Sequence, residues 1–289
     1  MINLSKYKYI ASMAVFVFLS TITKDSLWAQ SVHGSVIEIK TQEPLAFVHI
    51  GIRGKGVGTI SDEKGQFNLQ LNKDFHADTL TFSMIGYENL KVPIDSLLNG
   101  NSMIKMKPSP TQLKEAVVKS DKIRETLEFG RTEPTKMTTG ASGKDNYGVG
   151  QEIGTTIKND GGKYIIDAIS FHHRWNTVDS ILYRINIYTL KNGLPDTSIL
   201  QNELFVMAYK RDKWITKQVG GEVVLFEQDL FVSIELVRRW NNKGDNLLFY
   251  SHGVGQRECK NYIRSTSQGT WTTDFAFPLT LYLTVEKLE

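Results

Sequence analysis

Three stretches in the first third of the chain decide its fold: 43–50 (EPLAFVHI), 58–67 (GTISDEKGQF) and 80–87 (LTFSMIGY). In and around them apolar residues alternate with polar ones or glycine, which is the period of a half-buried strand. Asp62 and Gly65 bracket a polar tip that turns the chain, because glycine tolerates positive φ and aspartate bonds its own backbone. Short alternating strands joined by such turns predict an antiparallel β-sandwich. The alternating apolar positions are Val48, Ile50 and Ile52, then Phe67, Leu69 and Leu71, then Leu80, Phe82 and Met84.

The same residues carry a family resemblance. The stretch from Gly34 to Tyr87 resembles the carboxypeptidase regulatory-like (transthyretin-like) β-sandwich module, which is common in envelope proteins of the Bacteroidetes type. The resemblance implies a non-catalytic appendage that occurs beside peptidases, beside TonB-dependent receptors and in proteins with neither. It therefore implies an architecture and a compartment, and leaves the ligand open.

The N-terminus predicts export. Lys6 and Lys8 precede a short apolar run at 10–19, and a small residue, Ala29, stands at a cleavage point, so 1–29 is expected to be a signal peptide. The run is shorter than a comfortable membrane span. We expect an exported protein that is periplasmic, outer-membrane-associated or extracellular, with no transmembrane segment in the mature chain.

Composition narrows the class of partner. The one cysteine, Cys259, cannot form an internal disulfide, so stability has to come from buried cores. A formal net charge of +3 over 289 residues gives no argument for nucleic acid. The expected partner is an envelope protein or a glycan.

Four segments are expected along the chain: the signal peptide, a module at 30–107, a linker at 108–148 and a second sandwich at 149–289. Prolines after residue 107 interrupt the first sheet, and few aliphatics follow them. The linker is expected to be disordered, or an extended strand draped over a neighbour. Many short strand-like runs with polar turns predict a jelly-roll-like second sandwich.

A search for catalytic motifs yields no assignment. No histidine begins a His-x-x-Glu or His-Glu-x-x-His motif, and His172 and His173 would point to opposite faces of a strand. No Gly-x-Ser-x-Gly elbow is present. Six carboxylates of the second domain could pair in space, but nothing singles out two of them. These six carboxylates are Glu152, Asp167, Asp179, Glu222, Glu227 and Glu235. We expect no catalytic residue, metal or cofactor.

Aromatic residues give the one lead to a binding site. Trp175, Trp240 and Trp271 fall in the second domain beside polar neighbours, as expected of loop or rim positions. Exposed flat rings on a β-sandwich stack on sugars or anchor a protein partner. The alternative is that these rings fill the core of a sandwich without disulfides.

Three functions remain open. The leading hypothesis is a non-catalytic secreted or cell-envelope protein with a structural or binding role. The first alternative is a carbohydrate-binding envelope protein that uses the aromatics of the C-terminal domain. The second is an accessory subunit of a peptidase or of a TonB-dependent uptake system.

Overall fold

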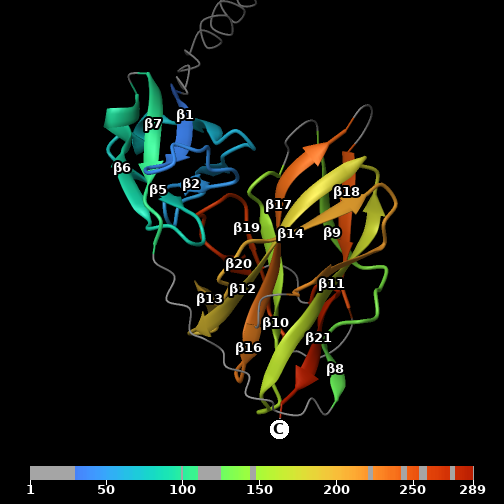
Figure 1. The fold of residues 1–289 in the computed structure, drawn as a ribbon. Helices are drawn as coiled ribbons and strands as arrows, with labels where there is room; N and C mark the ends of the chain where they lie inside the picture. Colours follow the sequence, from blue (N-terminus) through green and yellow to red (C-terminus); the bar gives the residue numbers. More distant parts are fainter. Residues whose placement is uncertain are drawn as a thin grey trace, which may run out of the picture.

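The computed structural model describes residues 30–98, 100–109, 125–143, 148–220, 224–241, 246–253, 259–273 and 277–288. These residues form β-strands and two short 3-10 helices, arranged as two sandwiches that lie against each other (Figure 1). The prediction of an all-β chain with two sandwiches is confirmed. The predicted signal peptide lies outside the described residues, as does much of the predicted linker.

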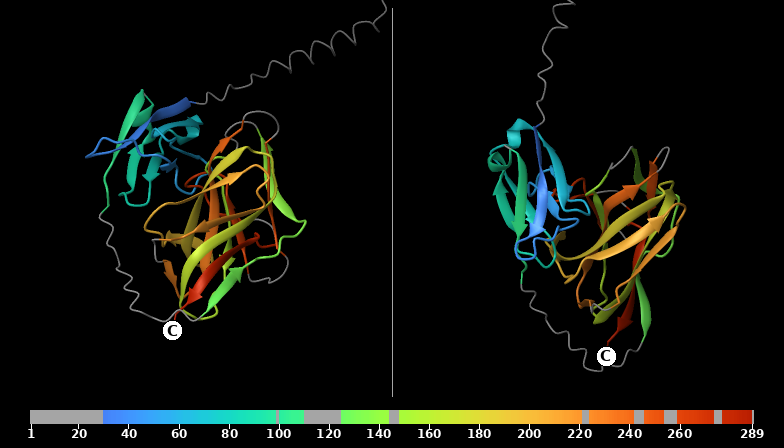
Figure 2. Two further views of the ribbon diagram at one scale, coloured as in Figure 1. Left: turned by 45° about the vertical axis from the view of Figure 1, so that its right-hand side comes forward. Right: turned by 45° about the horizontal axis from the view of Figure 1, so that its top comes forward.

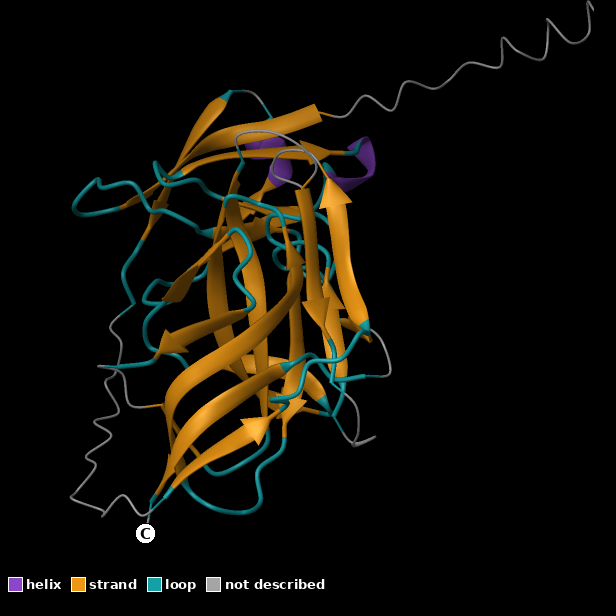
Figure 3. Ribbon diagram, turned by 90° about the vertical axis from the view of Figure 1, so that its right-hand side faces the viewer, coloured by secondary structure: helices purple, strands orange, loops and turns teal. Residues whose placement is uncertain are grey.

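The N-terminal sandwich, called the module below, is built from two small sheets. In the first, β1 is central; it pairs antiparallel with β4 and parallel with β7. The first sheet has the order β4 (Gln66–Leu71), β1 (Gln30–Glu38) and β7 (Asn101–Met106). The second has the order β3 (Gly58–Ile60), β2 (His49–Gly51), β5 (Thr79–Ser83) and β6 (Leu90–Pro93). The 3-10 helices η1 (Lys73–Phe75) and η2 (Ile94–Leu97) also belong to the module (Figure 3).

The alternation seen in the sequence is the packing pattern of the module. Phe67, Leu69 and Leu71 of β4 are buried and their polar neighbours are exposed. They join Val48 and Ile50 in one apolar core between the two sheets. The period-2 pattern therefore places this core correctly.

The second sandwich has one sheet toward the module and one away from it, called the near sheet and the far sheet (Figures 1 and 2). Two cross-strand pairings extend the far sheet beside the long strand β11. The near sheet has the order β13 (Leu194–Ser198), β12 (Ser180–Lys191), β17 (Leu230–Trp240), β10 (Glu152–Ile157), β19 (Asn261–Arg264) and β20 (Thr272–Thr273), with β14 (Leu204–Tyr209) also on β12. The far sheet has the order β8 (Thr126–Gly130), β21 (Leu281–Lys287), β11 (Tyr164–Asn176), β18 (Asn246–Ser251) and β9 (Thr138–Gly143), with β15 (Trp214–Gln218) and β16 (Val224–Phe226) also on β11.

Part of the predicted linker belongs to the second sandwich. β8 pairs with β21 and β9 pairs with β18, so both strands of 126–143 extend the far sheet. The prediction that all of 108–148 is a linker is therefore wrong for 126–143. The alternative prediction, an extended strand draped over a neighbour, describes these residues. Polar composition hid these strands because an edge strand needs few apolar side chains to pair through its backbone.

The second core lies between the near and far sheets. It is filled by aliphatic side chains from both sheets and by the rings of Tyr164, Phe171 and Tyr183. Ile85 of the module also packs against this core. Among the described residues, no helix is long and apolar enough to cross a membrane.

Candidate functional site

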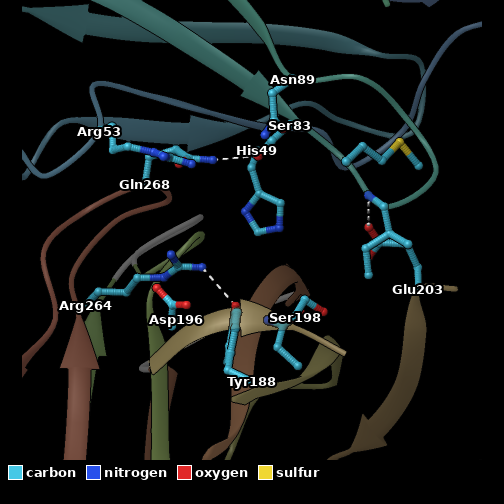
Figure 4. A pocket seen from close by; sticks show the side chains of 13 residues that line it. His49, Arg53, Ser83, Asn89, Tyr188, Asp196, Ser198, Glu203, Arg264 and Gln268 are labelled. Atoms are coloured by element: carbon cyan, nitrogen blue, oxygen red, sulfur yellow. Dashed lines mark hydrogen bonds between the residues drawn. The ribbon is translucent and has the colours of Figure 1, made fainter. Parts of the chain in front are cut away.

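A polar cavity of about 270 Å³ opens where the module meets the near sheet (Figure 4). Both sandwiches contribute its walls, and a hydrogen bond from Gln268 Nε2 to Ser83 Oγ (2.6 Å) joins them. Charged and amide side chains make up about half of its lining residues. The lining residues are His49, Arg53, Ser83, Met84, Ile85 and Asn89 from the module, and Asn186, Tyr188, Asp196, Ser198, Glu203, Arg264 and Gln268 from the second sandwich.

A row of four charges crosses the near sheet at the base of this cavity. Arg184 of β12 is in register with Glu235 of β17, which is in register with Glu152 of β10, which is in register with Arg264 of β19. Residues in register on neighbouring strands point to the same face, so the row runs plus, minus, minus, plus. We call these four residues the charge row.

Each carboxylate of the charge row has its own guanidinium. Arg184 Nη1 lies 3.0 Å from Glu235 Oε2, and Arg264 is paired with Glu152. Both carboxylates and Arg184 are almost wholly buried. A third carboxylate, Glu203 at the end of the β13–β14 connection, lies 2.5 Å from Arg184 Nε. Charges taken out of water this completely are tolerated only when they are paired.

Glu152 is also held by neutral donors. Asn186 Nδ2 donates to its Oε1 at 2.9 Å, Tyr188 Oη donates at 3.1 Å, and Ser233 Oγ donates to the same oxygen. Asn186 and Tyr188 follow Arg184 at two-residue steps on β12, so the strand period places all three on the cavity side. A buried carboxylate with this many donors is fixed in place.

His49 of the module reaches into the charge row. Arg184 Nη1 donates to His49 Nε2, so the imidazole proton sits on Nδ1, because a guanidinium can only donate. Nδ1 lies 2.9 Å from Ser267 Oγ and 3.4 Å from Glu235 Oε1. Burial lowers the pKa of His49 well below its usual value, and the neighbouring charge of Arg184 lowers it further. His49 is therefore neutral in the docked molecule.

The backbone beside His49 is shaped for this contact. Phe47 has φ of 61°, a left-handed conformation that a bulky residue rarely adopts. Its carbonyl accepts a hydrogen bond from Arg184 Nη2, and its ring packs on Phe205 of β14 with centroids 5.5 Å apart. Such conformations cost on the order of 1–3 kcal/mol and persist where surrounding contacts hold them. Here the contacts are those of the second sandwich.

Two glycines allow the domains to approach. A Cβ added to Gly58 would stand 2.1 Å from the Ser267 carbonyl oxygen, and one added to Gly51 would stand 2.7 Å from the same atom. The Gly54 amide donates to the Gln268 carbonyl across the boundary at 2.9 Å. The module is thus docked by backbone-to-backbone contact as well as by charge.

The buried carboxyl of Glu235 holds its proton more tightly than a free carboxyl does. Burial raises the pKa of Glu235 to about 7; Arg184 opposes that rise, and the nearby charge of Glu152 adds to it. Burial alone would lower the pKa of Arg264, but the charge of Glu152 outweighs it and raises that pKa. The interface therefore takes up a proton at Glu235 near neutral pH.

Stability should depend on pH through Glu235. A carboxyl whose pKa is raised on folding stabilises the native state fully below its unfolded pKa, and this contribution is lost as pH rises through about 7. We therefore expect the free energy of unfolding of Glu235→Gln, measured relative to that of the native chain at the same pH, to rise by on the order of 3 kcal/mol as pH rises from 4.5 to 7.5. His49 acts in the opposite direction, because its lowered pKa costs stability as pH falls below 6.5, and the variant should retain that trend.

Urea denaturation of both proteins across this pH range is the measurement. A difference between them that does not change with pH would contradict the protonation of Glu235. The matched control is Glu203→Gln, which removes an acid of the same cavity that lies nearer to solvent.

The structure separates the three tryptophans proposed as binding residues. Trp175 lies on β11 of the far sheet, is 50% exposed and packs edge-on against Phe249. Trp240 ends β17 of the near sheet, with the Arg238 guanidinium 5.0 Å from its ring centre. Among the described residues, no ring contact joins any two of the three.

Trp271 lies closest to the cavity. It packs on Tyr188 and Phe231 with centroids 6.1 and 5.1 Å apart, and the Arg264 guanidinium lies 4.8 Å from its ring centre. Tyr188 and Arg264 both line the cavity, so Trp271 supports its wall. Whether any of the three tryptophans binds a ligand stays a prediction.

The structure also places two of the candidate carboxylates and the pair His172 and His173. Glu152 and Glu235 stand side by side on neighbouring strands. Neither of them lines the cavity, whose wall on this side is formed by Asn186, Tyr188 and Arg264. His172 and His173 do point to opposite sides of β11, toward Ser251 and Tyr183 respectively, and both are buried. Across the described part of the chain, no group of three His, Cys, Asp or Glu side chains is placed to hold a metal ion.

Comparisons with solved structures give only broad likeness. One is a clostridial cysteine protease, Cwp84, after propeptide cleavage: 8% identical, TM-score 0.38, covering 90% of this chain and 66% of that one. Another holds the cysteine protease and lectin-like domains of Cwp84, a surface layer associated protein of Clostridium difficile: 9% identical, TM-score 0.36, covering 90% and 59%. The chain thus spans less than two thirds of either structure. No curated protein matches it.

The module has a family match. Residues 32–118 match the family model of the CarboxypepD_reg-like domain, which covers all of the module's strands from β2 to β7 and most of β1. The resemblance noted in the sequence at Gly34–Tyr87 lies wholly within this match. The chain therefore carries a carboxypeptidase regulatory-like domain within residues 32–118.

Proposed function

We propose that this chain is a non-catalytic, exported protein of the cell envelope, in which the regulatory-like module and the second sandwich act as one docked unit with a structural or binding role. The observation that carries the proposal is the charge row together with His49, which the module places on it. Arg184, Glu235, Glu152 and Arg264 neutralise one another, and His49 is bonded at both ring nitrogens.

These groups are engaged in holding two domains together. A general acid or base has to reach the proton it transfers, within hydrogen-bond distance of a bound substrate. The two buried carboxylates lie beneath Arg264, Tyr188, Asn186 and His49 in the cavity floor. The regulatory-like module supports the same role, because a domain of this kind is a non-catalytic β-sandwich. Export rests on the signal peptide expected at 1–29.

The test uses the full chain expressed with its N-terminus intact in a Gram-negative host. We expect protein in the periplasmic or surface fraction with Gln30 as its first residue, and no product from peptide or polysaccharide substrates. Cytoplasmic retention of the uncleaved chain would contradict export. Turnover that disappears in Glu235→Gln would contradict the non-catalytic role.

A second candidate function is carbohydrate binding, and one observation favours it. Trp175 leaves half of its surface in solvent although it lies on a paired strand, where a ring of this size is usually covered. Exposed aromatic rings on a sandwich face are suited to stacking on sugars.

A further inference from the structure

The far sheet carries a line of aromatic rings on its outer face. Trp214 of β15 packs edge-on against both His172 of β11 and Tyr282 of β21, with centroids 4.9 and 5.5 Å apart. Further along β11, Trp175 packs on Phe249 of β18 at 5.8 Å. We call these five residues the aromatic stripe. The inner face of the same strands faces the core, where His173 and Tyr250 meet Tyr183.

A shift in strand register brings Trp175 onto this face. The pairing of β11 with β18 slips between His173 and Trp175, so that Arg174 is the extra residue. An extra residue of this kind turns its neighbour out of the normal alternation. His172, Arg174 and Trp175 therefore share the outer face. Trp175 stands three residues beyond His172, roughly 10 Å along the strand.

Hydroxyl groups lie beside the rings of the stripe. His172 Nδ1 lies 2.8 Å from Ser251 Oγ, and Ser170 Oγ lies 2.9 Å from Thr216 Oγ1. Trp214 is 39% exposed beside these groups. Of the four residues in these two hydrogen bonds, Thr216 is exposed and the other three are buried, so a ligand lying along the stripe would meet ring surface beside the Thr216 hydroxyl. This mixture suits a sugar chain better than a bilayer, which favours contiguous apolar surface.

Two cations, Arg174 and Lys213, stand beside the stripe, and within the described part of the chain neither forms an ion pair with an acidic side chain. The Arg174 guanidinium lies 5.3 Å from the Trp175 ring centre, and its Nε has no hydrogen bond among the described residues. Lys213, next to Trp214, donates to the Arg174 carbonyl oxygen at 2.5 Å. The pKa of His172 is lowered first by burial and then by these two charges. Both positive charges are therefore close enough to the stripe to affect the ionisation of His172.

We propose that the aromatic stripe is a binding platform for an acidic polysaccharide, whose sugar faces stack on Trp175 and Trp214 and whose carboxylates or sulfates pair with Arg174 and Lys213. This inference rests on the second candidate function and names the class of its ligand and its site. Charge complementarity selects an acidic chain over a neutral one, because two cations stand beside the rings and no described carboxylate pairs with either of them. Of the three tryptophans first considered, it assigns the site to Trp175, with Trp214 added.

The experiment titrates the full mature chain with polygalacturonate, with its methyl ester and with a sulfated galactan, by calorimetry. We expect saturable binding of at least one acidic polymer, weakened as salt is raised. Binding should weaken at least tenfold in Trp175→Ala and in Arg174→Gln. The methyl ester, which keeps the sugar and loses the charge, should bind at least tenfold more weakly than polygalacturonate if the latter binds.

Matched controls keep the result interpretable. Trp240→Ala removes the same side chain from the near sheet, and Lys217→Gln removes a lysine from β15 on the side of buried Ile215. Both should bind like the native chain, and the thermal midpoint of every variant establishes that it is folded.

Three outcomes would overturn the proposal. They are no binding of either acidic polymer, binding that Trp175→Ala and Arg174→Gln leave unchanged, and binding only to phosphatidylglycerol vesicles, which would assign the stripe to a membrane surface. Cleavage of a polymer, read separately as new reducing ends, would contradict the non-catalytic role and not the platform.

Discussion

Replacing Arg184 by methionine should destabilise the protein by about 3–5 kcal/mol, one of the two largest effects we expect from a single substitution. The change leaves Glu235, which is fully buried, without its cation, and it removes the contacts to His49 and to the Phe47 carbonyl. The loss should be smaller at pH 5 than at pH 8, because an uncompensated Glu235 can take up a proton. Urea denaturation at the two pH values is the measurement.

The control for Arg184→Met is Arg53→Met. Arg53 lines the same cavity but is exposed and has no ion pair among the described residues, so we expect a change within about 0.5 kcal/mol. The double variant Arg184→Met with Glu235→Met should recover part of the lost stability, because no charge is then left buried alone. Equal, pH-independent losses in Arg184→Met and Arg53→Met would show that the charge row does not form.

Gly58→Val should separate the two sandwiches while leaving each folded. The new Cβ would stand 2.1 Å from the Ser267 carbonyl oxygen, a backbone atom that cannot rotate away. Relieving the overlap requires the module to move off the near sheet, and that movement breaks the contacts of His49 as well. We expect the radius of gyration in small-angle scattering to rise, and calorimetry to show two transitions where the native chain shows one.

The matched control is Gly56→Val, two residues earlier, in the β2–β3 loop that leads into Gly58. A Cβ on Gly56 meets no atom within 4 Å, so this variant should keep the native radius and a single transition. If Gly56→Val and Gly58→Val behave alike, loop conformation and not docking explains the effect. A native radius in both would contradict the close approach at Ser267.

The module could be predicted from sequence because its strands are half-buried. β4 alternates buried and exposed residues without exception, and the period-2 pattern is visible in its letters. The strand β10 (EIGTTI) gives no such signal. It lies between β17 and β19 and is buried on both faces, so no alternation marks it.

The charge row could not be found in the same way. Arg184 and Glu235 each stand within a strongly apolar strand, which is a signal that a charge is buried and paired. The sequence does not show which partner each one has, because that depends on the register between β12, β17 and β10. The insertion of His49 depends further on how two separate domains dock. Trp175 is an exposed ring, and the face on which it lies depends on the register shift at Arg174, which the sequence does not show.

The most direct test of the docked unit is hydrogen exchange at the Gly54 amide, measured by NMR in the full chain. Gly54 lies in an exposed loop of the module, and its amide donates to the Gln268 carbonyl of the second sandwich. We predict that it exchanges at least tenfold more slowly than the amide of Gly56 nearby, and that Gly58→Val abolishes the difference. Exchange of both amides at the rate of a free peptide in the native chain would show that the module is not docked on the near sheet.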